Sequence, residues 1–467
     1  MDERSVKALG EDAILPLMAR YCAPSIVSAV AGAAYNVADR AFVGRACGED
    51  AIAAITVCFP PTLFLLALAM TVGQGSATLV SIKLGGRDKD AAEGVLGQAV
   101  FLFLAFYVLA ASLVLSFMNP LLEFFGATEK ILPTASSYYS IIISGLIFEK
   151  IAYGVGNLVR AEGRPVFAMA TIFVGVLSNI FLDWLFLFEF GWGVSGAAAA
   201  TVCAQAIAAS MVVYFYFGGA SYLKIKLKNL RPRRRLAASM LYAGMPSLVI
   251  QGLSSLSMML FVRQARIYGS ESAIAVIGIS MTVTALVFMP CVGISLGMQP
   301  IVGYNWGAGN FARVRAAYLR GAAAGVAICT VGCLASQAFS DEIFSAFIGG
   351  GSPLVPIGKR ALGILMLCFP LVGLNVVTSG YFQSIKRPVV SVAITFLRQA
   401  VFLVPFLYFL PLWIGLDGIW AGFALSDFFS GVFTAAIAVR ELSILRKRIN
   451  CLREVKSVEK TANMQNI

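Results

Sequence analysis

Apolar stretches of about 20 residues recur along this chain. A helix needs roughly that length to cross the ~30 Å hydrocarbon layer of a bilayer, and few other structures are stable there. The chain is 59% hydrophobic and 13% charged, more apolar than a soluble domain of 467 residues. We therefore predict an all-α membrane protein whose first helix is retained rather than cleaved as a signal peptide. Its twelve transmembrane helices are centred near residues 30, 66, 105, 147, 178, 206, 250, 288, 327, 368, 400 and 428.

Basic residues are concentrated in alternate loops, on the side that also holds both termini. The clusters lie at residues 83–89, 160–164, 224–235, 313–320 and 386–387. Because basic loops remain in the cytoplasm, we predict a multi-pass protein of the plasma (inner) membrane with both termini cytoplasmic. The same distribution makes the lipid bilayer, not nucleic acid, the expected partner of the net charge of +12.

The sequence repeats itself after 222 residues, so that Pro24 aligns with Pro246 and Gly75 with Gly297. Each half has an even number of crossings, and both halves therefore enter the membrane from the same face. This predicts two six-helix bundles related by a pseudo-twofold axis along the membrane normal. The expected parts are an N-terminal lobe (1–220), a basic linker (221–235), a C-terminal lobe (236–440) and a polar, poorly ordered tail (441–467).

Two aspartates lie inside apolar stretches of the N-terminal lobe, Asp39 in the first and Asp183 in the fifth. Both stretches run outward, and each carboxylate lies ~8–10 Å below the outer end. Tyr35 shares a helix face with Asp39, Asn179 shares one with Asp183, and Thr201 reaches the same depth. Acids inside a membrane usually mark an ion or proton path. The cluster predicts a proton site or a Na+ site at Asp39, Asn179, Asp183 and Thr201, unless the acids only join helices.

Other polar residues lie within the apolar stretches. Glu149, Tyr153 and Asn157 form a stripe, and Glu149 either extends the acidic cluster, contacts a cationic substrate or pairs with Lys150. Near the middle of the membrane, Arg398 and Asp427 approach from opposite sides. We expect them to pair, as a structural ion pair or as a substrate contact. The candidate substrate or network residues are thus Glu149, Tyr153, Asn157, Gln299, Arg398 and Asp427.

Several segments resemble multidrug and toxic compound extrusion (MATE) transporters, most closely the MepA-like branch. They are residues 35–44 (YNVADRAFVG), 73–76 (GQGS) with 84–85, 179–183 with 193–197 (GVSGA), and 297–308 (GMQPIVGYNWGA). The resemblance covers about residues 10–440. It implies a two-lobed antiporter that exports cationic or amphipathic drugs in exchange for Na+ or H+ by alternating access. It also implies cation-site roles for Asp39, Asn179, Asp183 and Thr201, with Tyr35 beside them, and no cofactor besides the coupling ion.

Other functions fit the sequence less well. A flippase for lipid-linked oligosaccharides is the main alternative, but it needs a cleft rich in Arg and Lys, and only Lys150 and Arg398 are buried bases. The chain has no histidine and no HExxH or P-loop motif, so we do not expect an enzyme. No segment resembles a channel filter. We expect a monomeric multidrug exporter whose partners are small-molecule drugs and dyes.

Overall fold

A computed structural model describes residues 3–268, 271–348 and 354–465, which form helices joined by short loops and no strands. The first half contributes a short helix α1 (Glu3–Glu11), the long helices α2 (Ile14–Cys47), α3 (Glu49–Gly85) and α4 (Lys89–Ser116), and the short α5 (Met118–Phe124). There follow α6 (Leu132–Glu149), η1 (Lys150–Val155) and α7 (Gly156–Ala161) as one rod, α8 (Pro165–Trp184) with η2 (Leu185–Glu189), and α9 (Gly193–Phe217).

The second half repeats this order. A one-turn helix η3 (Leu227–Leu230) in the connection precedes α10 (Arg234–Tyr268), α11 (Glu271–Gly307), α12 (Phe311–Ala338) and α13 (Ser340–Ile348). The remaining helices are α14 (Leu354–Leu365), α15 (Phe369–Ser384), α16 (Pro388–Phe396) with η4 (Leu397–Leu403) and α17 (Val404–Ile414), and α18 (Leu416–Gln465).

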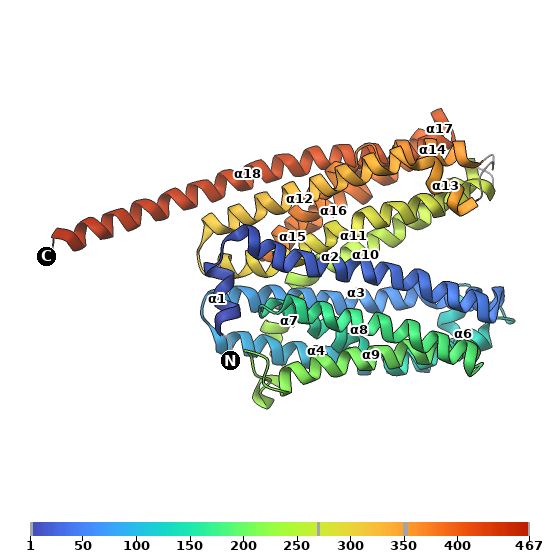
Figure 1. Cartoon of the computed structure of the whole chain (residues 1–467), viewed down its shortest axis with the longest axis horizontal. Helices are drawn as coiled ribbons and strands as arrows, with labels where there is room; N and C mark the ends of the chain where they lie inside the picture. Colours follow the sequence, from blue (N-terminus) through green and yellow to red (C-terminus); the bar gives the residue numbers. More distant parts are fainter. Residues whose placement is uncertain (1–2, 269–270, 349–353, 466–467) are drawn as a thin grey trace.

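Among the described residues, eleven helical rods are long and apolar enough to cross a membrane. The pair α14 and α15, bent by 48°, supplies a twelfth crossing. The predicted twelve-helix, two-lobed fold is therefore confirmed. Both termini lie at one end of the bundle (Figure 1), which we call the terminal face. Its cytoplasmic location remains a prediction.

The expected disorder of the tail is wrong, because α18 continues as a helix to Gln465. Figure 1 shows this helix projecting beyond the bundle at the terminal face. No glycine or proline follows Gly431, and the tail is rich in Leu, Glu, Lys and Arg, which favour helix. A polar composition alone does not predict disorder, because a polar segment can continue the transmembrane helix that precedes it.

Glycines set the distance between the lobes. A methyl group on Gly75 of α3 would overlap the Met240 carbonyl oxygen of α10, and one on Gly297 of α11 would lie 2.7 Å from Cys22 Cα of α2. These two glycines are equivalent in the 222-residue repeat. The repeat therefore encodes a pair of related crossings, α3 on α10 and α2 on α11, that join the two lobes.

A second pair of glycines joins α3 to α11 near the terminal face. A methyl group on Gly85 would overlap the Tyr304 carbonyl oxygen, and one on Gly307 would overlap the Ile82 carbonyl oxygen. Residues 82 and 304 are themselves 222 residues apart. The contact is therefore symmetric about the axis between the lobes, and the backbones meet too closely for any side chain larger than hydrogen.

The basic linker is attached to the N-terminal lobe through buried polar side chains. Oε2 of Glu162, 2% exposed, accepts hydrogen bonds from Ser221 Oγ (2.6 Å), Tyr222 N (3.1 Å) and Leu223 N (3.3 Å). Further along, the Gln98 side chain accepts a hydrogen bond from Arg233 N at 2.8 Å. The start and end of the linker are thus fixed to the first lobe.

Gly75→Ala should destabilise the protein by about 1–3 kcal/mol, because the added methyl group forces α3 and α10 apart. Gly252→Ala on α10 is the matched control, since no atom lies within 4 Å of its added methyl group. Thermal unfolding in detergent measures both. Equal midpoints for the two variants would contradict the close-contact interpretation.

Burial raises the pKa of Glu162 from 4.5 to about 7. Between these pH values the folded protein holds a proton that the unfolded chain releases, so stability should fall as pH rises from about 4.5 to about 7. Glu162→Gln keeps the group neutral and should remove this fall, making the variant up to about 3 kcal/mol more stable than wild type at pH 8. Thermal unfolding from pH 5 to pH 8 tests this, with the exposed Glu123→Gln as control. Parallel pH profiles for wild type and Glu162→Gln would refute it.

Candidate functional site

The acidic cluster predicted in the N-terminal lobe is assembled in the structure by three helices. The carboxyl groups of Asp39 on α2 and Asp183 on α8 lie close enough to interact, and the Asp183 side chain is fully buried. Two carboxyl groups form a hydrogen bond only when one of them carries a proton, because two ionised carboxylates repel and have no donor. The geometry therefore suits a pair of acids that share one proton.

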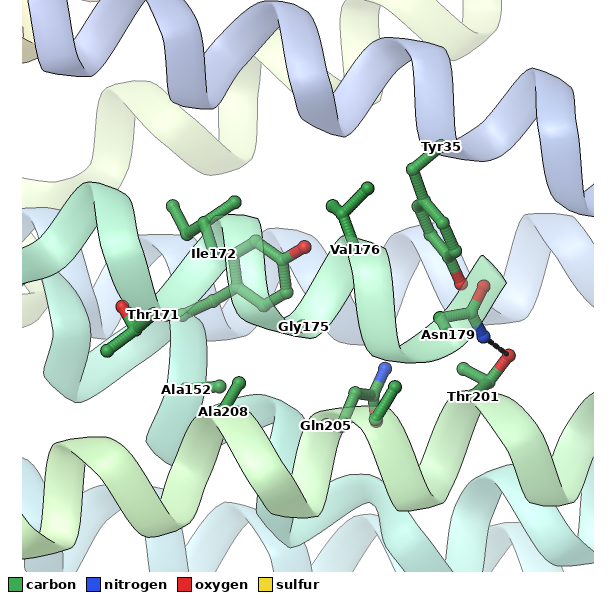
Figure 2. A pocket seen from close by; sticks show the side chains of 12 residues that line it. Tyr35, Ala152, Thr171, Ile172, Gly175, Val176, Asn179, Thr201, Gln205 and Ala208 are labelled. Carbon is green, nitrogen blue, oxygen red and sulfur yellow. Dashed lines mark hydrogen bonds between the residues drawn. The ribbon is translucent and has the colours of Figure 1, made fainter. Parts of the chain in front are cut away.

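Asn179, one helical turn before Asp183, connects the pair to α9. In one orientation of its amide, Nδ2 donates to Thr201 Oγ1 at 3.4 Å (Figure 2). In the opposite orientation, Nδ2 donates to Asp183 Oδ2 at 2.8 Å and the amide oxygen accepts from Thr201 N at 3.3 Å. The second orientation satisfies both ends of the amide, so we assign it. Tyr35 of α2 completes the cluster through a hydrogen bond between its hydroxyl and that of Thr201.

The second oxygen of Asp183 leaves the site incomplete. Asp183 Oδ1 is buried and has no hydrogen-bond donor within the described part of the chain. A shared proton or a small bound cation would supply the missing partner. Carboxylate, amide and hydroxyl oxygens are donors that suit a hard cation such as Na+. The residues present therefore fit either coupling ion.

A cavity extends from this cluster between α8, α9 and η1. Tyr35, Asn179 and Thr201 lie at one end of it, and Thr171 and Ala208 lie at the other (Figure 2). Its wall is otherwise mostly apolar. A mostly apolar cavity with a few polar groups is the usual form of a small-molecule site.

The other candidate residues of the N-terminal lobe, Glu149, Tyr153 and Asn157, have different surroundings in the structure. Tyr153 lines the cavity. Glu149 pairs with its neighbour instead: Lys150 Nζ donates to Glu149 Oε2 at 2.8 Å and to the Leu65 carbonyl at 3.2 Å. Asn157 accepts a hydrogen bond from Arg160 Nη1 at 3.3 Å and is not among the lining residues. Of the predicted stripe, only Tyr153 reaches the cavity.

The candidates from the second half lie in two places. Arg398 Nε donates to Asp427 Oδ1 at 2.6 Å, which is the expected pairing. Gln299 of α11 lies instead between the lobes, where its Nε2 donates to Thr78 Oγ1 at 2.7 Å and to the Gln74 carbonyl at 3.3 Å. Gln299 thus connects the two halves. The roles of all these residues in transport remain predictions.

Sequence reasoning missed two polar residues of the cavity, Thr171 and Gln205. A signal for Gln205 was present, because it follows Thr201 by four residues and therefore shares its helix face. Thr171 gives no comparable signal, since a threonine within an apolar helix usually bonds its own backbone. Here its hydroxyl donates to the Ala168 carbonyl at 2.8 Å.

Two lobes of six membrane-crossing helices, with a cavity inside one of them, are typical of a membrane transporter. Comparison with known proteins identifies the family. The family model MatE matches residues 24–185 and 246–409, and the chain belongs to this family. The predicted resemblance to MATE transporters is confirmed.

Named relatives and solved structures agree with this assignment. The chain is 21% identical over 409 residues to the multidrug export protein MepA of Staphylococcus aureus (strain NCTC 8325 / PS 47), covering 87% of this chain and 89% of the relative. It is 23% identical over 412 residues to MepA of Staphylococcus haemolyticus (strain JCSC1435), covering 88% and 90%. A solved outward-facing conformation of a multidrug resistance MATE family transporter of the MOP superfamily aligns with a TM-score of 0.90 at 25% identity, covering 96% of this chain and 100% of that one.

Filling the cavity should weaken ligand binding without changing the acids. Ala208→Leu places a larger side chain against the cavity wall, and we expect cationic dyes to bind at least about tenfold more weakly, since overpacking costs ~1–3 kcal/mol and ~1.4 kcal/mol is a factor of ten. Ser210→Leu, exposed on the same helix, is the matched control. Equilibrium binding of tetraphenylphosphonium to the purified variants measures the effect, and unchanged affinity in Ala208→Leu would exclude this cavity as the dye site.

Proposed function

We propose that this chain is a secondary active multidrug exporter of the plasma membrane. It exchanges cationic or amphipathic drugs and dyes for H+ or Na+ by alternating access. The observation that carries this proposal is the pair of neighbouring carboxyl groups, Asp39 and Asp183, beside a mostly apolar cavity. The names of the MepA relatives support the substrate class.

Two neighbouring carboxyl groups favour a proton as the coupling ion, because one shared proton relieves their mutual repulsion. Binding a drug cation near the pair would favour the ionised state, because opposite charges attract most strongly in a site of low dielectric constant. Release of the drug would in turn favour protonation. Exchange follows when the two ligands prefer different states of the lobe, since a ligand with equal affinity for both states shifts nothing. Na+ at Asp39, Asn179, Asp183 and Thr201 is the second candidate.

Alternating access requires the contacts at the terminal face to separate. The Gln299 hydrogen bonds to Thr78 and Gln74, together with the glycine contacts at residues 85 and 307, hold the lobes together there. Hydrogen bonds and close backbone contacts of this kind have two discrete arrangements, made or broken, as a two-state transporter needs. A monomer suffices for this cycle, because one chain supplies both lobes.

A flippase for lipid-linked oligosaccharides is less well supported. It would need basic side chains available for pyrophosphate. Lys150 and Arg398, the candidates for that task, are both paired with acids.

Asp39→Asn and Asp183→Asn should each reduce gradient-driven dye export to the leak observed in empty vesicles, because an amide cannot take up and release the coupling proton. Asp341→Asn, a change at an exposed acid, is the control and should export normally. Dye movement in proteoliposomes measures the rates, and thermal unfolding verifies that each variant is folded. A folded Asp183→Asn protein that still exports dye against its gradient would exclude Asp183 as the coupling residue.

The same vesicles distinguish the two coupling ions. An imposed pH gradient without Na+ should drive export by the wild-type protein, and an imposed Na+ gradient at equal pH should not. The reverse result would assign Na+ to the site. Export with neither gradient would contradict secondary transport altogether.

A further inference from the structure

The short helix α1 lies across the terminal face and not along the bundle (Figure 1). Asp12 and Ala13 separate it from α2. At the 222-residue offset, residues 3–11 of α1 correspond to 225–233, a part of the linker that Gln98 holds against the N-terminal lobe. The chain therefore places a short segment before the first long helix of each lobe. The contacts of α1 differ from those of the linker, because α1 contacts both lobes.

Hydrogen bonds attach the end of α1 to the C-terminal lobe. The Leu9 carbonyl oxygen accepts from Asn305 Nδ2 at 2.8 Å and from Arg313 Nη2 at 3.2 Å, and Arg313 Nη2 also donates to the Asp12 carbonyl at 2.6 Å. The last carbonyls of a helix lack a partner within it, and these two side chains supply one. The Leu9 side chain is 0% exposed and belongs to a hydrophobic cluster that includes Val314 of α12.

The same face of α1 also packs against the N-terminal lobe. Val6 precedes Leu9 by three residues, shares its helix face and is 5% exposed. It belongs to a hydrophobic cluster whose other buried members lie in the N-terminal lobe, apart from Leu223 of the linker and Met240 of α10. That cluster includes Leu84, near the end of α3. One short helix is therefore packed against both lobes at once.

α1 lies beside a close contact between the lobes. A methyl group on Gly10 would be 2.9 Å from Cε1 of Tyr304 on α11. The carbonyl oxygen of the same tyrosine is the atom that Gly85 of α3 approaches across the interface. When the lobes separate here, α1 cannot keep its contacts with both. Its hydrogen bonds attach it to the C-terminal lobe, so opening breaks the apolar contact of Val6 with the N-terminal lobe.

We propose that α1 is a strap that holds the terminal face closed and sets the fraction of time for which this face is open. A contact made in one state and lost in the other stabilises the state that has it. Loss of the strap therefore raises the open population without changing the acid pair or the cavity. This inference rests on the proposed alternating access and adds a control over one of its two states.

Labelling of a cysteine buried between the lobes measures the open population. Ser81 of α3 is 0% exposed and lies beside Gly303 of α11, where a methyl group on the glycine would be 2.9 Å from Ser81 Cβ. In the purified Ser81→Cys protein, a water-soluble maleimide reaches residue 81 when the lobes separate, so its labelling rate follows the open population. Mass spectrometry of the peptide that contains residue 81 gives this rate. Cys451, exposed on α18, should label at the same rate in every variant.

Variants of α1 in this background test the strap. Val6→Ser should raise the labelling rate at residue 81 about tenfold, the shift expected when a buried valine side chain loses its apolar contacts. Deletion of residues 2–11 should raise the rate at least as much. Glu11→Gln, a change at an exposed position of the same helix, is the matched control and should leave the rate unchanged.

Cys58, 1% exposed near the other end of α3, distinguishes opening of the terminal face from general loosening. Its labelling should remain slow in Val6→Ser. Equal increases at Cys58 and residue 81, or an unchanged rate at residue 81 in the deletion variant, would overturn the proposal. The labelling needs neither a drug nor an ion gradient, so a failure of dye export in vesicles would refute the proposed function without deciding this test.

Discussion

A charge buried among apolar helices needs a partner, and this requirement places every polar group within the two lobes. Asp39 and Asp183 meet this need with each other, Lys150 with Glu149, and Arg398 with Asp427. The chemistry of each pairing differs. An acid–base pair is neutral as it stands, whereas two acids become neutral enough to remain buried only by taking up a proton or another cation. The acid pair therefore differs from the two acid–base pairs, because it needs a proton or a cation to become neutral.

Glycines supply the other constraint, because they fix where the lobes touch. The contacts of Gly85 and Gly307 are related by the repeat and lie near the terminal face. These two symmetric contacts hold the bundles together close to one end. Gln299 has no counterpart in this symmetry, since the residue equivalent to it is Ala77. The hydrogen bonds of Gln299 therefore add a directional contact that the repeat does not duplicate.

Most of the fold was predictable from the sequence, because a bilayer leaves a chain of this composition only one way to satisfy its backbone hydrogen bonds. The acid pair was predictable for the same reason: Asp39 and Asp183 are exceptional in apolar segments. Thr171 and Gln205 could not be predicted as cavity residues, since threonine and glutamine occur in many transmembrane helices without lining a cavity. The choice of Lys150 as the partner of Glu149 depended on side-chain directions that spacing does not determine. The prediction of a poorly ordered tail was wrong because a polar composition indicates that a segment is solvated and does not indicate that its helix ends.

The two lobes share one scaffold but differ in the kind of charge they hold. At the positions equivalent to Asp39 and Asp183, the second lobe has Phe261 and Pro405, neither of which ionises. Its buried charges belong to Arg398 and Asp427, and a guanidinium does not lose its proton in proteins. The second lobe therefore cannot exchange protons through that arginine, which pairs with Asp427. The two lobes therefore differ in kind, because one holds a pair of carboxyl groups that can take up a proton and the other holds a guanidinium that stays charged.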